Sequence, residues 1–219
     1  MKTVVSMQEM PEFDIKPSDL LDEFYKLTRE EVASLLAGAQ LYAVPCPACG
    51  MDDAELAFEK IGMKYRECRH CASLYVSPRP TEVELTQYYR NSRAAHFWRE
   101  QVLSATADSR LEKIIEPRVQ WVLDGLVDYM PQAQVGLDVS TNAQVFVQVL
   151  LHNKPRLTQI VAAHPLADID FQNSISKVSV KPSDLKNFEA FGQFDFITAF
   201  DLLDRCADLP AFVQAAQRV

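Results

Sequence analysis

The sequence of 219 residues predicts an α/β fold in which helices and a small cysteine-rich ribbon precede a parallel sheet. Three observations support this prediction: two Cys-x2-Cys pairs, capped apolar helical stripes in the first half, and alternating apolar strands and helices in the second half. We divide the chain into an N-terminal helical segment (1–40), the ribbon with the start of the next helix (41–92), a helical linker (93–130) and the sheet domain (131–219).

Composition and charge exclude several classes of protein. The chain has 22 Lys and Arg residues against 30 Asp and Glu residues, a net charge of −8. This acidic balance argues against binding to nucleic acids or to anionic membranes. No apolar run approaches the length of about eighteen residues that a membrane span needs, and the first residues lack the apolar core of a secretory signal. We therefore expect a soluble cytoplasmic protein with no membrane partner.

The N-terminal segment is expected to hold a loose leader, residues 1–16, and two helices. Ser18 begins the first helix, which carries an apolar stripe. Thr28 and Glu31 match a Thr-x-x-Glu capping box, so a second helix is expected to start there and to end at Gly38. This helical pair would pack on the ribbon or on the sheet domain.

The four cysteines of the two pairs predict a metal site. They are Cys46 with Cys49, and Cys68 with Cys71, separated by eighteen residues. This spacing is typical of a structural zinc site, in which four thiolates surround the ion and leave no position open for water. Disulfide bonds are one alternative, and replacement of Cys71 by His70 as a ligand is another. The fifth cysteine, Cys206, is interpreted as a free thiol, and a reducing compartment suits zinc–thiolate chemistry.

Two short strands, residues 55–60 and 63–68, are predicted between the cysteine pairs, with Gly62 near the turn. After the second pair, a Thr81-x-x-Glu84 capping box predicts the start of a helix. Residues 94–130 are predicted to be largely helical, with Pro117 ending or kinking a helix.

From residue 134 onward, apolar strands alternate with helices. The strands are predicted at 134–139, 157–163, 176–180 and 194–200, and the helices at 143–151 and 209–219. Continuous apolar strands in a βαβ rhythm are typical of a parallel sheet that helices cover on both faces.

Several segments together resemble a known family. Zinc knuckles are followed by Ser-Pro-Arg-Pro-Thr-Glu-x-Glu-Leu-x-x-Tyr-Tyr (77–89), then by Leu137-Asp138-Val139 in a first strand and by 194–203 as a fourth strand and its exit. This order resembles bacterial class I S-adenosylmethionine-dependent methyltransferases that carry an N-terminal zinc-binding domain, over residues 17–219. The resemblance implies an α/β fold: N-terminal helices and a zinc ribbon followed by a partial Rossmann-like methyltransferase sheet.

The resemblance also implies a place for the cofactor, at which this chain departs from the family. It would place S-adenosylmethionine against Asp138, Asn142, His164 and Asp201. However, the family's glycine-rich loop reads Ser-Thr-Asn-Ala-Gln here (140–144), although glycine allows the close backbone approach that such a ligand needs. His164 stands where the family has an acid that accepts both ribose hydroxyls, and imidazole can accept only one such bond.

These departures predict that S-adenosylmethionine binding has been lost and that the protein is a non-catalytic, partner-binding subunit. Where many relatives have Leu-Glu-His after the fourth strand, this chain has Leu203-Asp204-Arg205, so no catalytic residue is assigned. The alternative is an active methyltransferase, or half of one, acting on a sugar or small metabolite, so the sequence leaves open whether the chain is an enzyme. A nucleic-acid adaptor is disfavoured by the acidic balance.

A further expectation concerns the strand at 194–200. The family's sheet has seven strands, and the sequence given ends after the helix that follows the fourth. The strand at 194–200 would then have an open edge, which favours pairing with a protein partner or self-association. A shortened chain or natural fragment is the third explanation, and the sequence does not choose among the three.

Overall fold

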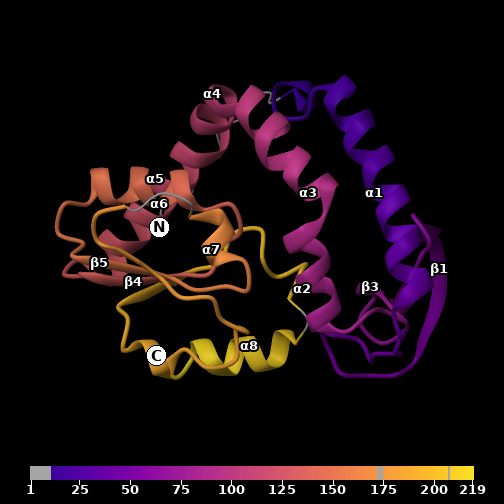
Figure 1. Ribbon diagram of the computed structural model, residues 1–219. Helices are drawn as coiled ribbons and strands as arrows, with labels where there is room; N and C mark the ends of the chain where they lie inside the picture. Colours follow the sequence, from indigo (N-terminus) through magenta and orange to yellow (C-terminus); the bar gives the residue numbers. More distant parts are fainter. Residues whose placement is uncertain (1–10, 172–174, 207) are drawn as a thin grey trace.

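The computed structural model describes residues 11–171, 175–206 and 208–219, so the first ten residues of the expected leader lie outside the described part. Helix α1 (Ser18–Gly38) and the cysteine-containing ribbon lie on one side of the molecule, and a parallel sheet lies on the other. Helices α2 (Glu82–Asn91) and α3 (Arg93–Phe97) run between them (Figure 1). The predicted α/β fold class is confirmed.

Helix α1 follows a short 3-10 turn, η1 (Glu12–Asp14), and is continuous over 21 residues. The predicted break at Thr28 is therefore wrong. The Thr28 hydroxyl donates to the carbonyl of Phe24 at 2.7 Å, one turn earlier, so it acts inside the helix rather than as a cap. The predicted end of the helix at Gly38 is confirmed.

Glu31, the expected capping partner of Thr28, instead binds the start of α3. Its carboxylate accepts hydrogen bonds from the Ser92 hydroxyl at 2.7 Å, from Arg93 N at 2.7 Å and from Ala94 N at 3.1 Å. Partial burial opposes ionisation of Glu31, but these hydrogen bonds outweigh it and hold the pKa of this carboxyl below its usual value. A residue of α1 thus satisfies the free N–H groups of another helix.

The ribbon is an antiparallel sheet with the strand order β1-β2-β3. Its strands are β1 (Ala54–Lys60), β2 (Met63–Cys68) and β3 (Leu74–Val76). Ile61 and Gly62 form the predicted turn between β1 and β2, and both have positive φ, as a two-residue type I′ hairpin requires. A Cβ on Gly62 would lie 2.9 Å from Leu36 Cδ1, so glycine also lets α1 approach the ribbon closely.

Helical turns of several kinds connect the ribbon to the parallel sheet. After α2 and α3 come η2 (Trp98–Leu103), α4 (Ala107–Arg110), η3 (Leu111–Ile115) and α5 (Glu116–Tyr129). The capping box of Thr81 and Glu84 at the start of α2 is confirmed. Pro117 lies in the first turn of α5, directly after the π-helical turn η3, so the helix changes type where proline offers no N–H.

The second sheet has four parallel strands in the order β6-β5-β4-β7. Its strands are β4 (Val135–Asp138), β5 (Gln159–Ala162), β6 (Val178–Val180) and β7 (Phe196–Thr198), each within a predicted strand. Its connections contain α6 (Gln144–Asn153), α7 (Ala167–Asp170), η4 (Glu189–Phe191) and α8 (Leu209–Ala216). Helices α5 and α6 cover one face and α8 covers the other (Figure 1).

Alternate strand residues supply the two halves of the core. Leu137 and Val161 pack with Phe212 on the α8 face, whereas Ile160 packs with Phe146 on the α6 face. A Cβ on Gly136 would lie 2.4 Å from the ring of Phe196, so glycine leaves the room that this ring occupies beside β4. The predicted helix-covered parallel sheet is confirmed.

The strand order determines where a ligand would normally bind. Successive strands add on one side of β4 as far as β6, and the chain then crosses to β7 on the other side. In doubly wound sheets, ligands occupy the crevice outside the carboxyl ends of the strands at such a reversal. Within the described residues, β7 pairs only with β4, so its other side is a sheet edge.

None of the helices in the described part of the chain is both long enough and apolar enough to cross a membrane.

Candidate functional site

The four cysteines of the ribbon form one cluster, in which all four Sγ atoms lie within 4.8 Å of one another. The Sγ atoms of Cys46 and Cys71 are 3.6 Å apart, as are those of Cys49 and Cys68. A disulfide bond would need about 2.05 Å, so these are free thiols and the disulfide alternative does not apply. The cluster can hold one metal ion.

Two similar backbone turns direct the cysteines inward. Gly50 N donates to Cys46 O at 2.8 Å, and Ala72 N donates to Cys68 O at 2.8 Å. Gly50 has φ of 75° and Ala72 has φ of 58°, so both turns end in the left-handed region. Each Cys-x2-Cys pair is therefore bent by its own backbone into the same shape, with both sulfurs on one side.

The cluster is half covered: Cys46 and Cys68 are buried, whereas Cys49 and Cys71 are exposed. Hydrogen bonds from Ser73 lower the pKa of Cys71 to about 6. For Cys49, a backbone hydrogen bond from Met51 favours the thiolate, but desolvation and three neighbouring thiols raise its pKa to about 12. The opposite directions of the two shifts reflect repulsion between neighbouring thiolates, which a bound cation would relieve.

The other candidate ligands lie apart from the cluster. His70 is exposed and is not a member of the cluster that the described residues form. Cys206 is buried in the core on the α8 face of the parallel sheet, and burial raises the pKa of its thiol.

The carboxyl edge of the parallel sheet brings together three of the four predicted cofactor residues: Asp138, Asn142 and His164. Asn142 and His164 both lie against Asp170 of α7, which the sequence analysis did not single out and which no local motif marks, and Asp138 interacts electrostatically with His164. Asp170 Oδ2 accepts a hydrogen bond from Asn142 N at 2.6 Å and lies 3.3 Å from His164 Nε2, without hydrogen-bond geometry to that nitrogen. His164 is 1% exposed, and its Nδ1 accepts from Leu166 N at 3.3 Å.

Asp138 is 1% exposed, and neighbouring groups occupy its carboxylate. It accepts hydrogen bonds from Ser140 N at 3.2 Å, from Ser140 Oγ at 2.9 Å and from Thr198 Oγ1 at 2.6 Å. Burial raises the pKa of Asp138 to about 6, although these hydrogen bonds act in the opposite direction. Asp138 therefore joins the ends of β4 and β7 from inside the protein.

Strands β4 and β7 stay connected beyond their last residues. Val139 N donates to Thr198 O at 2.9 Å, and Thr141 N donates to Phe200 O at 3.2 Å. In the return direction, Phe200 N donates to Ser140 Oγ at 2.8 Å. The two chain segments thus remain hydrogen-bonded across the reversal of the strand order, where a ligand crevice would open.

Asp201, the fourth predicted cofactor residue, lies apart from the other three. Its carboxylate accepts two hydrogen bonds from Arg118 of α5, at 2.8 and 3.0 Å, and its carbonyl accepts from Thr141 Oγ1 at 3.1 Å. The Arg118 guanidinium also lies 4.9 Å from the centre of the Phe200 ring. Helix α5 therefore covers the exit of β7.

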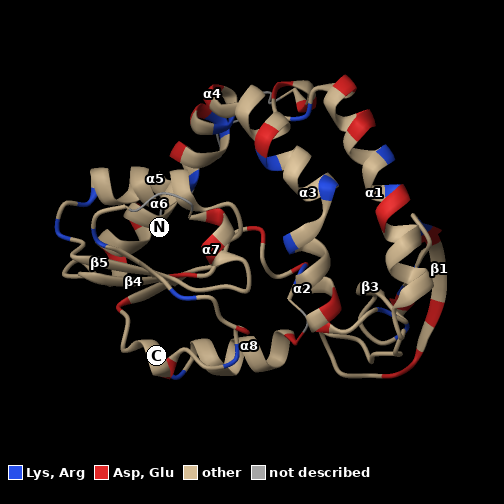
Figure 2. Cartoon of the chain, in the orientation of Figure 1, with Lys and Arg blue, Asp and Glu red and all other residues tan. Residues whose placement is uncertain are grey.

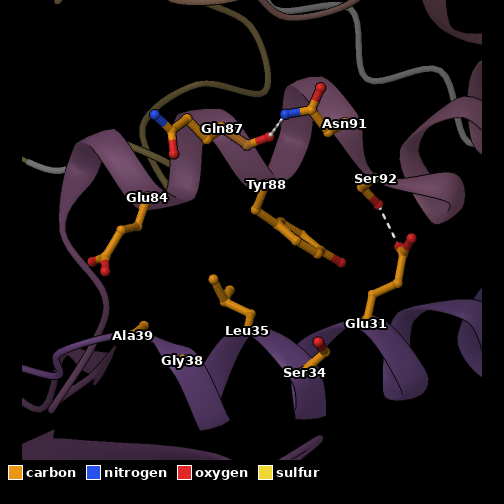
Figure 3. A pocket seen from close by; sticks show the side chains of 10 residues that line it. All are labelled: Glu31, Ser34, Leu35, Gly38, Ala39, Glu84, Gln87, Tyr88, Asn91 and Ser92. Atoms are coloured by element: carbon orange, nitrogen blue, oxygen red, sulfur yellow. Dashed lines mark hydrogen bonds between the residues drawn. The ribbon is translucent and has the colours of Figure 1, made fainter.

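The larger of two described cavities, about 440 Å³, lies between α1 and α2. Leu35 of α1 and Tyr88 of α2 point toward each other across it, and the hydrogen bond between Glu31 and Ser92 closes one end (Figure 3). The smaller cavity, about 210 Å³, lies in the ribbon. Neither cavity is lined by any of the four predicted cofactor residues.

No protein-family model, curated protein or solved structure matches this chain.

Proposed function

We propose that this chain is a zinc-binding, methyltransferase-like protein that has lost S-adenosylmethionine binding and acts as a non-catalytic, partner-binding subunit. The observation that carries the proposal is the continued hydrogen bonding of β4 and β7 beyond the strands, where a cofactor would have to lie.

Several donors of the loop after β4 are already engaged within the protein. Three consecutive N–H groups have acceptors within the protein: Ser140 N donates to Asp138, Thr141 N to Phe200 O and Asn142 N to Asp170. A cofactor would have to displace these bonds and would also meet side chains where glycine normally leaves room. The loop is therefore built to bind the protein's own groups.

His164, at the position of the ribose-binding acid, also faces inward. Its side chain is buried, one nitrogen accepts a backbone N–H, and the other faces Asp170. Such a group has no free acceptor for the two hydroxyls of a ribose. This arrangement supports the loss of the cofactor independently of the loop.

The metal we propose is zinc. A tetrahedral ion with Zn–S bonds of about 2.3 Å has sulfur atoms about 3.8 Å apart, close to the 3.6 Å separations in the cluster. Four thiolates favour zinc over hard cations, and a four-cysteine set leaves no position for a reacting water. The ribbon's own core consists of Cys46, Cys68 and Tyr75, so the ion would replace a larger apolar core.

The partner surface we propose is the edge at residues 194–200. The outer side of β7 has no partner strand in the described part of the chain, and an unpaired edge binds a strand of another chain by backbone hydrogen bonds. Lys and Arg residues are interspersed with Asp and Glu along α1 and the ribbon (Figure 2), which supports a protein partner or a second copy rather than a nucleic acid.

Titration calorimetry of the metal-loaded protein with S-adenosylmethionine and S-adenosylhomocysteine tests the loss of the cofactor. We expect no saturable heat at millimolar concentrations. In a parallel thermal unfolding experiment, we expect no shift in the melting temperature. Saturable binding would contradict the proposal and restore the alternative of an active methyltransferase acting on a sugar or small metabolite.

Sedimentation velocity over a range of protein concentrations tests the proposed edge. Self-association would appear as a larger species at high concentration, protected from hydrogen exchange at 194–200. A monomer at every concentration would leave a different protein as the occupant of the edge.

A further inference from the structure

Helix α7 is held at the carboxyl edge of the sheet from two opposite sides. Asp170, at its end, points inward with a side chain that is 5% exposed, and Asp168 points outward with a side chain that is 43% exposed. We call residues 164–170 the α7 plug.

The outer contact comes from Arg90 of α2, the helix that follows the ribbon. Its guanidinium donates to Asp168 at 2.6 and 3.0 Å and to Pro165 O at 3.1 Å. Arg90 also lowers the pKa of Asp168 by these hydrogen bonds, so the pair is charged at neutral pH. A planar fork that binds both carboxylate oxygens and a carbonyl fixes orientation as well as distance.

The inner contact is the hydrogen bond from Asn142 N to Asp170, at 2.6 Å. Asn142 has φ of 54°, so its N–H belongs to the strained turn that leads from β4 into α6. In doubly wound sheets, the N–H groups of this turn face a bound ligand. Here a carboxylate of the same chain accepts the hydrogen bond instead.

We propose that the α7 plug is an internal latch that closes the carboxyl edge of the sheet: Asp170 takes the place beside Asn142 where ligands bind in other doubly wound sheets, and Arg90 fastens the plug from outside. The inference rests on the proposed function, because it explains how the loop after β4 comes to be occupied from within. It adds that α2, through Arg90, holds the carboxyl edge of the sheet closed.

Hydrogen exchange of the full-length, metal-loaded protein tests the plug. Arg90→Ala removes three hydrogen bonds from the plug without altering Asp170 or Asn142. We expect the amide of Asn142 and those of residues 165–171 to exchange roughly three- to tenfold faster, because the plug opens more often. Arg90→Lys, which keeps the charge but loses the fork, is expected to give an intermediate increase.

Lys186→Ala is the matched control. Lys186 Nζ binds Glu82 at 2.9 Å, so this variant removes another ion pair between α2 and the sheet domain without touching the plug. Its Asn142 amide is expected to exchange at the wild-type rate. Unchanged exchange in Arg90→Ala, or an equal increase in Lys186→Ala, would overturn the proposal.

A second variant changes the inner contact of the plug. It controls for the case in which Arg90→Ala accelerates exchange by destabilising the whole protein. Asp170→Ala removes the acceptor of Asn142 N, and it is expected to accelerate exchange at Asn142 while the ribbon amides keep their wild-type rates. A protected Asn142 amide in this variant would contradict the inner contact. Neither exchange result depends on cofactor binding, so failure of the plug and failure of the proposed function are told apart.

Discussion

The ribbon and the carboxyl edge of the parallel sheet both gather polar side chains at chain turns, but they differ in what those side chains contact. In the ribbon, backbone groups satisfy one another through bonds such as Ala72 N to Cys68 O, and the four sulfurs are left facing a common centre. At the sheet edge, the side chains themselves are used: Asp138 binds Ser140 and Thr198, and Asp170 binds Asn142.

This difference separates a cluster that can hold a metal ion from a sheet edge at which several donors already have acceptors within the protein. Four close sulfur atoms suit a metal cation, because thiolates that repel one another are stabilised together when they bind a common ion. At the sheet edge, Ser140 N and Asn142 N have acceptors within the protein, and buried His164 Nε2 lacks a hydrogen-bond partner. A family-like frame is therefore weaker support for a ligand than the groups that remain unsatisfied within it.

Removal of one metal ligand tests the comparison with the largest expected effect. Cys68→Ser is expected to abolish metal binding and ribbon folding, because structural zinc contributes on the order of 10 kcal/mol to such modules. The parallel sheet is expected to stay folded. Metal content by mass spectrometry and amide exchange measure both effects.

Cys206→Ser is the matched control for this variant, since Cys206 is a buried cysteine outside the cluster. It should keep one metal ion per chain. A metal-free Cys68→Ser protein with a protected ribbon would show that the ribbon does not need the ion.

The buried carboxyl of Asp138 gives the next largest effect. Its pKa is raised to about 6 in the folded protein, so the folded state holds a proton between pH 4 and 6 that the unfolded chain releases. The stability from this group is fully present below about pH 4 and is lost as the pH rises through about 6. Asp138→Asn should remove this slope, whose full height is on the order of 3 kcal/mol, because an amide does not titrate.

Urea unfolding at pH values from 4 to 8 measures this prediction, with the exposed Asp204→Asn as control. Parallel stability curves for wild type and Asp138→Asn would contradict the raised pKa.

Glu31 of α1 binds the start of α3, and its replacement is expected to change the free energy of unfolding by a smaller amount. Glu31→Gln places an amide NH2 group among the donors of Ser92, Arg93 and Ala94, at a cost of about 1.5–3 kcal/mol at neutral pH. Because the folded pKa of Glu31 is lowered, its stabilisation is present above about pH 4 and is lost as the pH falls further.

Thermal unfolding of wild type and Glu31→Gln at pH 7 and pH 3.5 checks both parts. The neighbouring Glu30→Gln, which affects a more exposed ion pair with Arg93, is the control. An equal difference at both pH values would show that the charge of Glu31 is not involved.

The smallest expected effects come from substitutions in the two Cys-x2-Cys turns, which end at Gly50 and Ala72. Ala72→Gly relieves a left-handed conformation and should strengthen the ribbon by about 0.5–1 kcal/mol, whereas Gly50→Ala should weaken it by a similar amount. A Cβ at Gly50 would meet nothing within 4 Å, so strain alone sets the cost. Metal competition titrations measure both, and a change of the same sign in the two variants would contradict the similarity of the turns.

Much of the fold follows from patterns within short stretches of chain. The four strands of the parallel sheet, the first two strands of the ribbon, and the capping box of Thr81 and Glu84 were predicted because each depends on neighbouring residues, whereas β3 was not predicted. The break at Thr28 was wrong because a threonine hydroxyl has two local uses, and it here binds Phe24 O within the helix. No local pattern distinguishes a threonine that caps a new helix from one that binds a carbonyl inside a continuous helix.

What the sequence by itself determined is the cysteine cluster and the order of the elements, because spacing and apolar periodicity act locally. What only the tertiary structure decided is which partner each polar group binds. Asp170 lies 28 residues from Asn142, Asp168 lies 78 residues from Arg90, and Asp201 lies 83 residues from Arg118. Such pairs form only when packing brings distant elements together, and they determine whether the sheet edge is open to a ligand.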